Sequence, residues 1–145
     1  MGILRLFDNT HRDSFTRPEL RFRFGLSNQI TPPPFAALVF DTPEGVAAQD
    51  RLAVTIRADR PMRIWVQLRA PRNGGQADSW QRSIYLAPGS EDRVVYFDDL
   101  SPAGRAETLR PPLDRVRSVL FVVDPVNTKR ESAGRIWIKR AALQR

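Results

Sequence analysis

The sequence contains no cysteine and only one histidine, His11, among its 145 residues. The absence of cysteine excludes a disulfide framework, thiol catalysis and thiolate metal sites, although it does not fix the cellular compartment. A single histidine beside Arg12 and Asp13 is typical of a solvated side chain. The sequence also has no serine elbow, glycine-rich phosphate loop, His–Glu zinc pattern or dinucleotide fingerprint. We therefore expect a protein that is not an enzyme and that uses no cofactor or metal.

Long hydrophobic runs are absent too. The apolar stretch at the N-terminus, around Ile3 and Leu4, is too short for a signal-peptide core, and no later run could span a membrane. Position 6 is Leu6 instead of Ser or Thr, which excludes N-myristoylation despite Gly2. As written, the chain is expected to stay in the cytoplasm. It would be extracytoplasmic if it were a domain of a longer secreted or membrane protein.

Lysine is scarce although the protein is basic, with a formal net charge of +7. Only Lys129 and Lys139 are lysines among the 23 basic residues, so arginine supplies the rest. Arginine suits carboxylates, phosphates and aromatic rings, but a G+C-rich bacterial coding sequence also produces it in quantity. The basic residues are interleaved with acids and form no run of five or six like charges. Nucleic acid is therefore not an expected partner, whereas weak attraction to anions is expected.

The size and pattern of the chain predict one all-β domain. A chain of this length buries roughly 68–70% of the surface that its unfolded form exposes, so it needs no disulfide or structural metal to hold a core together. Twelve prolines argue against long helices. Residues 20–24 alternate as Leu-Arg-Phe-Arg-Phe, which is typical of a half-buried strand. Strands are predicted at residues 20–24, 36–40, 52–58, 62–70, 80–86, 93–97, 118–124 and 135–143.

The connections complete the predicted architecture. Residues 31–34 (Thr-Pro-Pro-Pro) form an extended connector, which divides an N-terminal segment, 1–34, from a β-sandwich domain, 35–145. The N-terminal segment has one strand and is packed on the sandwich or part of it. Strands 52–58 and 62–70 are predicted to form a hairpin through Asp59-Arg60-Pro61, and 101–114 a long loop with a helical turn near 113–116. The continuously apolar strand 118–124 should be covered on both faces or central in its sheet. The spacing favours a jelly-roll β-sandwich of two antiparallel sheets, with a small closed barrel as the alternative.

The C-terminal half, about residues 50–143, resembles the β-sandwich modules of the carbohydrate-binding and galactose-binding-like superfamily. The resemblance rests on segments 52–59, 63–69, 80–86 and 97–100, and above all on Ser-Val-Leu-Phe-Val-Val-Asp at 118–124 followed by Gly-Arg-Ile-Trp-Ile at 134–138. It implies a jelly roll whose relatives often bind sugars on a concave sheet face or at a loop end.

The same resemblance implies where a metal would be held. Many relatives carry acidic residues after the Trp-Ile step of the last strand, where they help to hold a structural calcium ion. Here those positions are Lys139 and Arg140, which would repel the ion, so we predict that this site is absent. Asp41, Glu44 and Asp50 remain a candidate acidic cluster, but acids close together in a turn are more often surface residues.

Period-two alternation places three aromatic residues on polar strand faces. Trp65 shares its face with Arg63, Gln67 and Arg69; Tyr85 shares its face with Gln81 and Ser83; and Trp137 shares its face with Arg135 and Lys139. Trp80 has Ile84 and Leu86 as facemates, which indicates a core residue. Aromatic rings can stack on the C–H patches of a sugar, and neighbouring Arg and Gln side chains can donate hydrogen bonds to its hydroxyls. This combination is typical of a glycan-binding surface. The candidate ligand-binding residues are Arg57, Trp65, Gln67, Arg69, Gln81, Tyr85 and Trp137.

Other interpretations of these residues stay open. Tryptophan and arginine on an outer face can also stack on one another, cover the sheet, or contact another chain or a parent domain. Asp98 and Asp99 are adjacent, so on a regular strand they cannot both flank one glycosidic bond. The sequence thus predicts a non-catalytic, carbohydrate-binding-like module. The alternatives are a structural module that docks on a larger protein or assembly, and weak binding of anionic polymers by scattered arginines.

Overall fold

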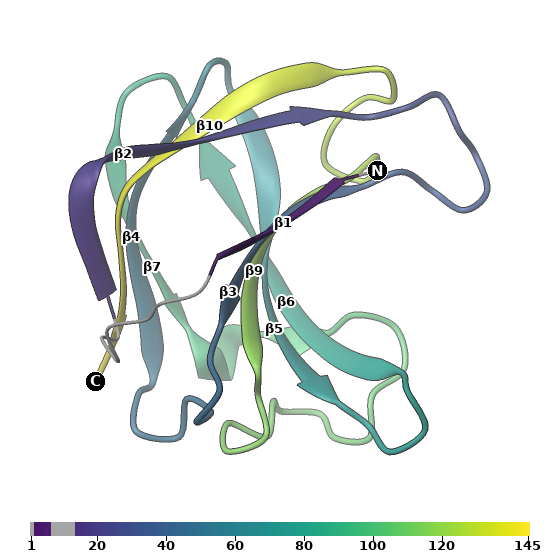
Figure 1. Ribbon diagram of the computed structural model, residues 1–145, viewed down its shortest axis with the longest axis vertical. Coiled ribbons are helices and arrows are strands. Elements are labelled where there is room, and N and C mark those ends of the chain that lie inside the picture. The colour runs from purple at the N-terminus through teal and green to yellow at the C-terminus, as the bar shows by residue number, and fades with distance from the viewer. Residues whose placement is uncertain (1, 7–13) are drawn as a thin grey trace.

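The structure, a computed structural model, describes residues 2–6 and 14–145 (Figure 1). His11 lies outside the described residues. The strands are β1 (Gly2–Leu6), β2 (Ser14–Gly25), β3 (Ala36–Asp41), β4 (Arg51–Ala58), β5 (Met62–Pro71), β6 (Ala77–Leu86), β7 (Glu91–Tyr96), β8 (Ser101–Pro102), β9 (Ser118–Val123) and β10 (Ala133–Gln144), with a 3-10 turn at Phe97–Asp99.

The strands form two sheets. One has six strands in the order β1-β3-β9-β5-β6-β8, and the other has four in the order β2-β10-β4-β7. Neighbouring strands are antiparallel except for β1 and β3, which are parallel. In Figure 1, β4 and β7 lie toward the left of the view, and β3, β9, β5 and β6 toward the right. The predicted all-β sandwich is confirmed, and the closed barrel is not adopted.

All eight predicted strands are present, and two further ones were missed. β1 has no clear periodicity in the sequence, and β8 is two residues long within the predicted loop 101–114. The N-terminal strands are integrated into the fold, because β1 pairs with β3 and β2 pairs with β10. The predicted helical turn near 113–116 is confirmed, since the N–H groups of Arg115 and Val116 both donate to the Pro112 carbonyl.

The main core lies between the two sheets. Burial alternates along β4 and β5, so one side of each strand faces inward, as the period of two predicts. Trp80 is 1% exposed, and its Nε1 donates to the Thr108 carbonyl at 3.1 Å. The prediction that Trp80 belongs to the core is confirmed. The largest fully buried core side chains on both sheets include Phe121, Leu38, Ile56, Ile64, Leu68, Leu86, Ile136 and Ile138.

Strand β9 is buried on both faces. All six of its residues are buried, which confirms the interpretation of the continuous apolar run. On the outer side of the six-stranded sheet, Leu120 and Val122 form a second buried cluster with Ala37 and Val39. Among β3, β9, β5 and β6, the exposed part of this outer face is therefore confined largely to β5 and β6.

The predicted hairpin between β4 and β5 is wrong, because the two strands belong to different sheets. The connection Asp59–Pro61 carries the chain from one sheet to the other. The N–H of Asp59 donates to the Arg135 carbonyl, and the Asp59 carboxylate accepts from the Arg135 N–H. A three-residue hairpin loop usually ends on a residue with positive φ, and the last residue of Asp59–Pro61 is a proline, which cannot adopt it. The tight hairpin instead joins β5 to β6, where Gly74 and Gly75 have φ of 100° and 96°.

Within residues 2–6 and 14–145, the structure holds no helix with the length and apolarity needed to cross a bilayer.

Candidate functional site

The structure divides the predicted site residues between two surfaces. Five lie on the six-stranded sheet, on β5 and β6: Trp65, Gln67, Arg69, Gln81 and Tyr85. The other two lie on the four-stranded sheet, on β4 and β10: Arg57 and Trp137. Period-two alternation identifies the outer face of each strand but not the sheet to which the strand belongs. The seven residues therefore lie on two different surfaces, five on one and two on the other.

The first surface, which we call the β5–β6 face, is a polar strip with two aromatic rings. Trp65 lies opposite Ser83, and Gln67 lies opposite Gln81, across the antiparallel pair. Gln67 Nε2 donates to Gln81 Oε1 at 2.7 Å, which aligns the two amides. Tyr85 is two residues beyond Ser83 on β6 and is 44% exposed. Trp65 and Tyr85 thus occupy diagonal positions of the antiparallel pair, and the backbones at such positions are about 7–8 Å apart in a typical sheet.

The Trp65 ring is held in place by a carboxylate. Trp65 is half-buried and packs against the second apolar cluster. Its Nε1 donates to Asp124 Oδ2 at 3.0 Å. The other oxygen of Asp124 accepts from the N–H groups of Val126 and Asn127, which fixes the carboxylate in the turn after β9. Packing on one side and a charge-assisted hydrogen bond on the other restrict the indole orientation.

A polar chain continues beside Trp65. Arg63 Nε donates to Ser83 Oγ at 2.7 Å, and Ser83 Oγ donates in turn to Asn127 Oδ1 at 3.5 Å. Within the described residues, Asn127 Nδ2 is the buried side-chain nitrogen that has no hydrogen-bond partner. An unsatisfied buried donor is uncommon in native proteins, and an ordered water is one group that would satisfy it.

The second surface surrounds Trp137 on the four-stranded sheet. The Arg57 guanidinium carbon lies 3.9 Å from the Trp137 ring centroid, which is a cation–π contact. Arg57 also donates to both carboxylate oxygens of Glu19, at 2.9 and 3.2 Å. The hydrogen bond from Arg57 lowers the pKa of Glu19, and the charges of Arg57 and Lys139 lower it further. Arg57 is therefore engaged by protein groups on two sides.

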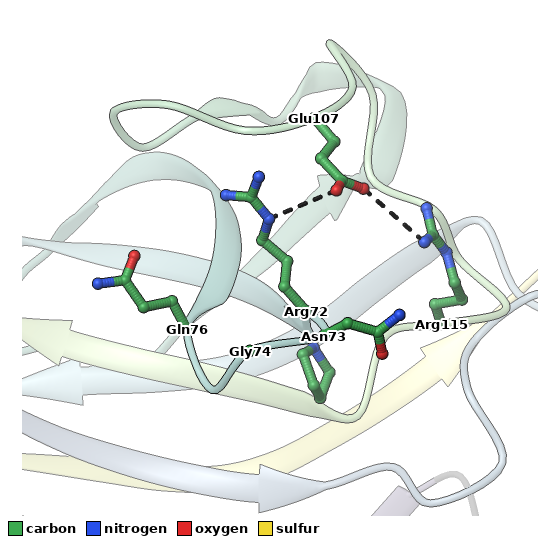
Figure 2. A pocket seen from close by; sticks show the side chains of 7 residues that line it. Arg72, Asn73, Gly74, Gln76, Glu107 and Arg115 are labelled. Atoms are coloured by element: carbon green, nitrogen blue, oxygen red, sulfur yellow. Dashed lines mark ion pairs between the residues drawn. The ribbon is translucent and has the colours of Figure 1, made fainter.

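A cleft of about 540 Å³ lies at the loops that follow β5 and β8 (Figure 2). Glu107 lies between Arg72 and Arg115 there, with N–O distances of 3.5 and 4.0 Å. Arg72 also contacts the buried Asp78, whose second oxygen accepts the Glu107 N–H. These charges neutralise one another and tie two loops together, so the cleft offers a ligand little unmatched charge.

The acidic residues considered for a metal or for catalysis do not come together. Among the described residues, no group of three His, Cys, Asp or Glu side chains could hold a metal ion. Asp50 pairs instead with Arg51, and Glu44 is exposed. Asp98 and Asp99 occupy the 3-10 turn and not a regular strand, and Asp98 pairs with Arg110 at 3.0 Å.

Three residues of the β5–β6 face were missed as site residues: Asp124, Ser83 and Asn127. A signal for Asp124 was present, because a single acid ending an apolar strand and followed by proline is typical of a turn that uses its carboxylate. Ser83 shares the polar face of Tyr85 by alternation. The position of Asn127 depends on the fold of its loop, which local sequence does not give.

Comparison with solved structures shows the fold of carbohydrate-binding modules. A family 11 carbohydrate-binding module from Clostridium thermocellum, in complex with a β-1,3-1,4-mixed-linked tetrasaccharide, matches with a TM-score of 0.59 and 13% identity, over 90% of this chain and 87% of that one. The family 11 module of the cellulase Lic26A-Cel5E from Clostridium thermocellum matches with a TM-score of 0.58 and 13% identity, over 91% and 86%. A family 30 carbohydrate-binding module matches with a TM-score of 0.59 and 11% identity, over 90% and 80%. No protein-family model matches the sequence, and no curated protein is similar to it in sequence.

Proposed function

We propose that this protein is a non-catalytic module that binds a neutral glycan chain on the β5–β6 face. The observation that carries the proposal is the fixed Trp65 ring, bonded to Asp124 and placed diagonally to the exposed Tyr85. Two rings in this arrangement can stack on neighbouring sugars of one chain. The fold shared with carbohydrate-binding modules supports the same conclusion.

The polar residues of the face suit sugar hydroxyls. Gln67 and Gln81 share one hydrogen bond. Each side-chain amide has two donor hydrogens and two acceptor lone pairs, so both residues keep donors and acceptors that can bind sugar hydroxyls. Arg63 presents a guanidinium beside Tyr85, its partner across the strand pair. Hydroxyls need such fixed donors and acceptors, whereas sugar C–H faces need the rings. Arg69 lies on the same strand face, where it extends the polar strip.

Catalysis finds no support in the described residues. Glycoside hydrolysis uses two carboxyl groups that flank the scissile bond. Asp124 is the carboxylate that contacts the residues of the β5–β6 face described above. Both of its oxygens already accept hydrogen bonds, from Trp65 and from two backbone N–H groups. The face thus provides a binding surface without an acid–base pair.

Affinity electrophoresis on soluble polysaccharides tests the proposal. Mixed-linkage β-1,3-1,4-glucan is the first ligand to try, because the tetrasaccharide bound to the family 11 module has that linkage. The decisive pair of variants is Tyr85→Ala and Tyr96→Ala. Both tyrosines are 44% exposed, but Tyr85 lies on the six-stranded sheet and Tyr96 on the four-stranded one. We expect Tyr85→Ala to weaken binding about tenfold, equivalent to about 1.4 kcal/mol, and Tyr96→Ala to leave it unchanged.

Other outcomes would redirect the assignment. Binding that is lost in Trp137→Ala but kept in Tyr85→Ala would move the site to the four-stranded sheet. No retardation by any of a panel of glucans, mannans, xylans and galactans would reject glycan binding and favour the alternative, a module that docks on a larger protein.

A further inference from the structure

The four-stranded sheet carries a strip of positively charged residues on its outer face. We call it the basic strip, and its members are Arg21, Arg23, Arg135, Lys139 and Arg140. All five are exposed, on the neighbouring strands β2 and β10. Within the part of the chain that the structure describes, none of the five side chains forms an ion pair or a hydrogen bond.

The acids near the strip are occupied by other groups. Glu19 is bound by Arg57 through both of its oxygens. Asp59 pairs with Arg60 and accepts a backbone N–H. Asp92 accepts the hydroxyl of Thr55 at 2.6 Å. Lys139 lies near enough to Glu19 to lower its pKa, but none of the five strip residues forms an ion pair with a carboxylate of the described residues.

Two of the cations face each other directly. Arg23 is the register partner of Arg135 across the β2–β10 pair. Like charges at directly opposite positions destabilise a sheet. An anion between the two guanidinium groups would remove this repulsion and form charge-assisted hydrogen bonds with both.

We infer that the basic strip is a docking surface for an extended acidic segment of a partner protein. Arg21 and Arg23 are two residues apart on one strand, a separation of about 6.6–6.8 Å. An extended peptide repeats its side chains at the same interval, so carboxylates at alternate positions fall in register with these arginines. The guanidinium fork is also well matched to a carboxylate, with which it makes two parallel hydrogen bonds.

The aromatic residue within the strip argues against bases or sugars as the occupant. Recognition of single-stranded nucleic acid depends on bases that stack on open aromatic rings. Trp137 lies opposite Arg21, but Arg57 covers its ring at 3.9 Å. The surface recognises its partner by charge, and it lies on the side of the sandwich opposite to the β5–β6 face. This inference does not depend on the proposed glycan site.

Fluorescence anisotropy with a labelled peptide that has glutamate at alternate positions tests the inference, with the glutamine version of the peptide as ligand control. We expect the triple variant Arg21→Gln, Arg23→Gln, Arg135→Gln to bind roughly tenfold more weakly than wild type, the combined effect of three exposed ion pairs. The difference should shrink as salt is added. Because the variant relieves the repulsion between Arg23 and Arg135, its melting temperature should be no lower than that of wild type.

A second triple variant separates a defined surface from general charge. Arg82→Gln, Arg105→Gln, Lys129→Gln removes the same charge from exposed positions off the strip, and we expect it to weaken binding less than about twofold. An equal loss in both variants would overturn the inference. Competition provides a further test, with polygalacturonate and a single-stranded oligonucleotide as competitors. If either displaces the labelled peptide at a lower concentration of negative charge than the unlabelled peptide does, the strip selects polysaccharide or nucleic acid and the inference is overturned.

Discussion

The hydrogen bond between Trp65 and Asp124 predicts a measurable coupling in the free energy of unfolding. A hydrogen bond to a charged group contributes about 1.5–3 kcal/mol, and the half-buried position of Trp65 favours the lower end. Asp124→Ala also removes the acceptor for two backbone N–H groups, so we expect it to destabilise the protein by about 2–4 kcal/mol. Trp65→Phe keeps an apolar ring but loses the donor, and we expect a smaller loss of about 1–2 kcal/mol.

The test is a double-mutant cycle. Urea unfolding of wild type, Trp65→Phe, Asp124→Ala and the double variant gives four free energies of unfolding. We expect the double variant to be about 1–1.5 kcal/mol more stable than the sum of the single losses implies, because the shared bond is lost only once. At this chain length, each kcal/mol corresponds to roughly 3–5 °C in melting temperature, which gives an independent measurement.

A coupling below about 0.5 kcal/mol would refute the reasoning, since distant and independent sites add within that margin. The indole would then be oriented by packing alone. Binding adds a second readout, because Asp124 acts as a positioning residue for Trp65. Asp124→Ala should weaken glycan binding although Asp124 itself need not touch the sugar, and it should also reduce the near-ultraviolet circular dichroism of Trp65.

Three other predictions follow from the packing and the charges. Gly45→Ala should lower the free energy of unfolding, measured with urea, by about 1–3 kcal/mol, the usual cost of a strained backbone position. The φ angle of Gly45 is +78°, and an added Cβ would lie 2.7 Å from a backbone oxygen. Gly89→Ala is the control, because open space surrounds Gly89, and it should leave the free energy of unfolding unchanged. Phe121→Ala should destabilise by about 3–5 kcal/mol in the same assay, since the ring is 1% exposed in the core. The pKa of Glu19 is lowered by the hydrogen bond from Arg57, so its contribution to stability is present above the ordinary value of 4.5 and lost as the pH falls below it. Thermal melts should therefore show an advantage over Glu19→Gln at pH 6 that shrinks progressively as the pH falls below 4.5; an advantage of the same size at pH 6 and at the acid end of the series would contradict the assignment.

Local sequence patterns were sufficient for eight of the ten strands but not for their pairing. Alternation along residues 52–58 and 62–70 correctly identifies two strands and their inner faces, because the period of two is a local property. The pairing of those strands depends on distant segments, since β4 pairs with β10 and β7 while β5 pairs with β6 and β9. For that reason the expected hairpin failed although both strands were correct.

The same distinction explains the candidate site. Trp65 and Trp137 each have polar facemates, so both are expected on outer faces, and both are half-buried there. Their assignment to opposite sides of the sandwich requires the sheet order. The bond from Trp65 to Asp124 joins residues 59 positions apart, a relationship that no local spacing contains.

The N-terminal strands have a practical consequence for anyone who shortens this protein. β1 covers the edge of β3 in one sheet, and β2 covers the edge of β10 in the other. A fragment that starts after the proline connector would expose two bare strand edges at once, one on each sheet. Such edges recruit other chains into intermolecular sheets, so recombinant fragments that begin near residue 35 should precipitate or self-associate even though most of the core residues remain.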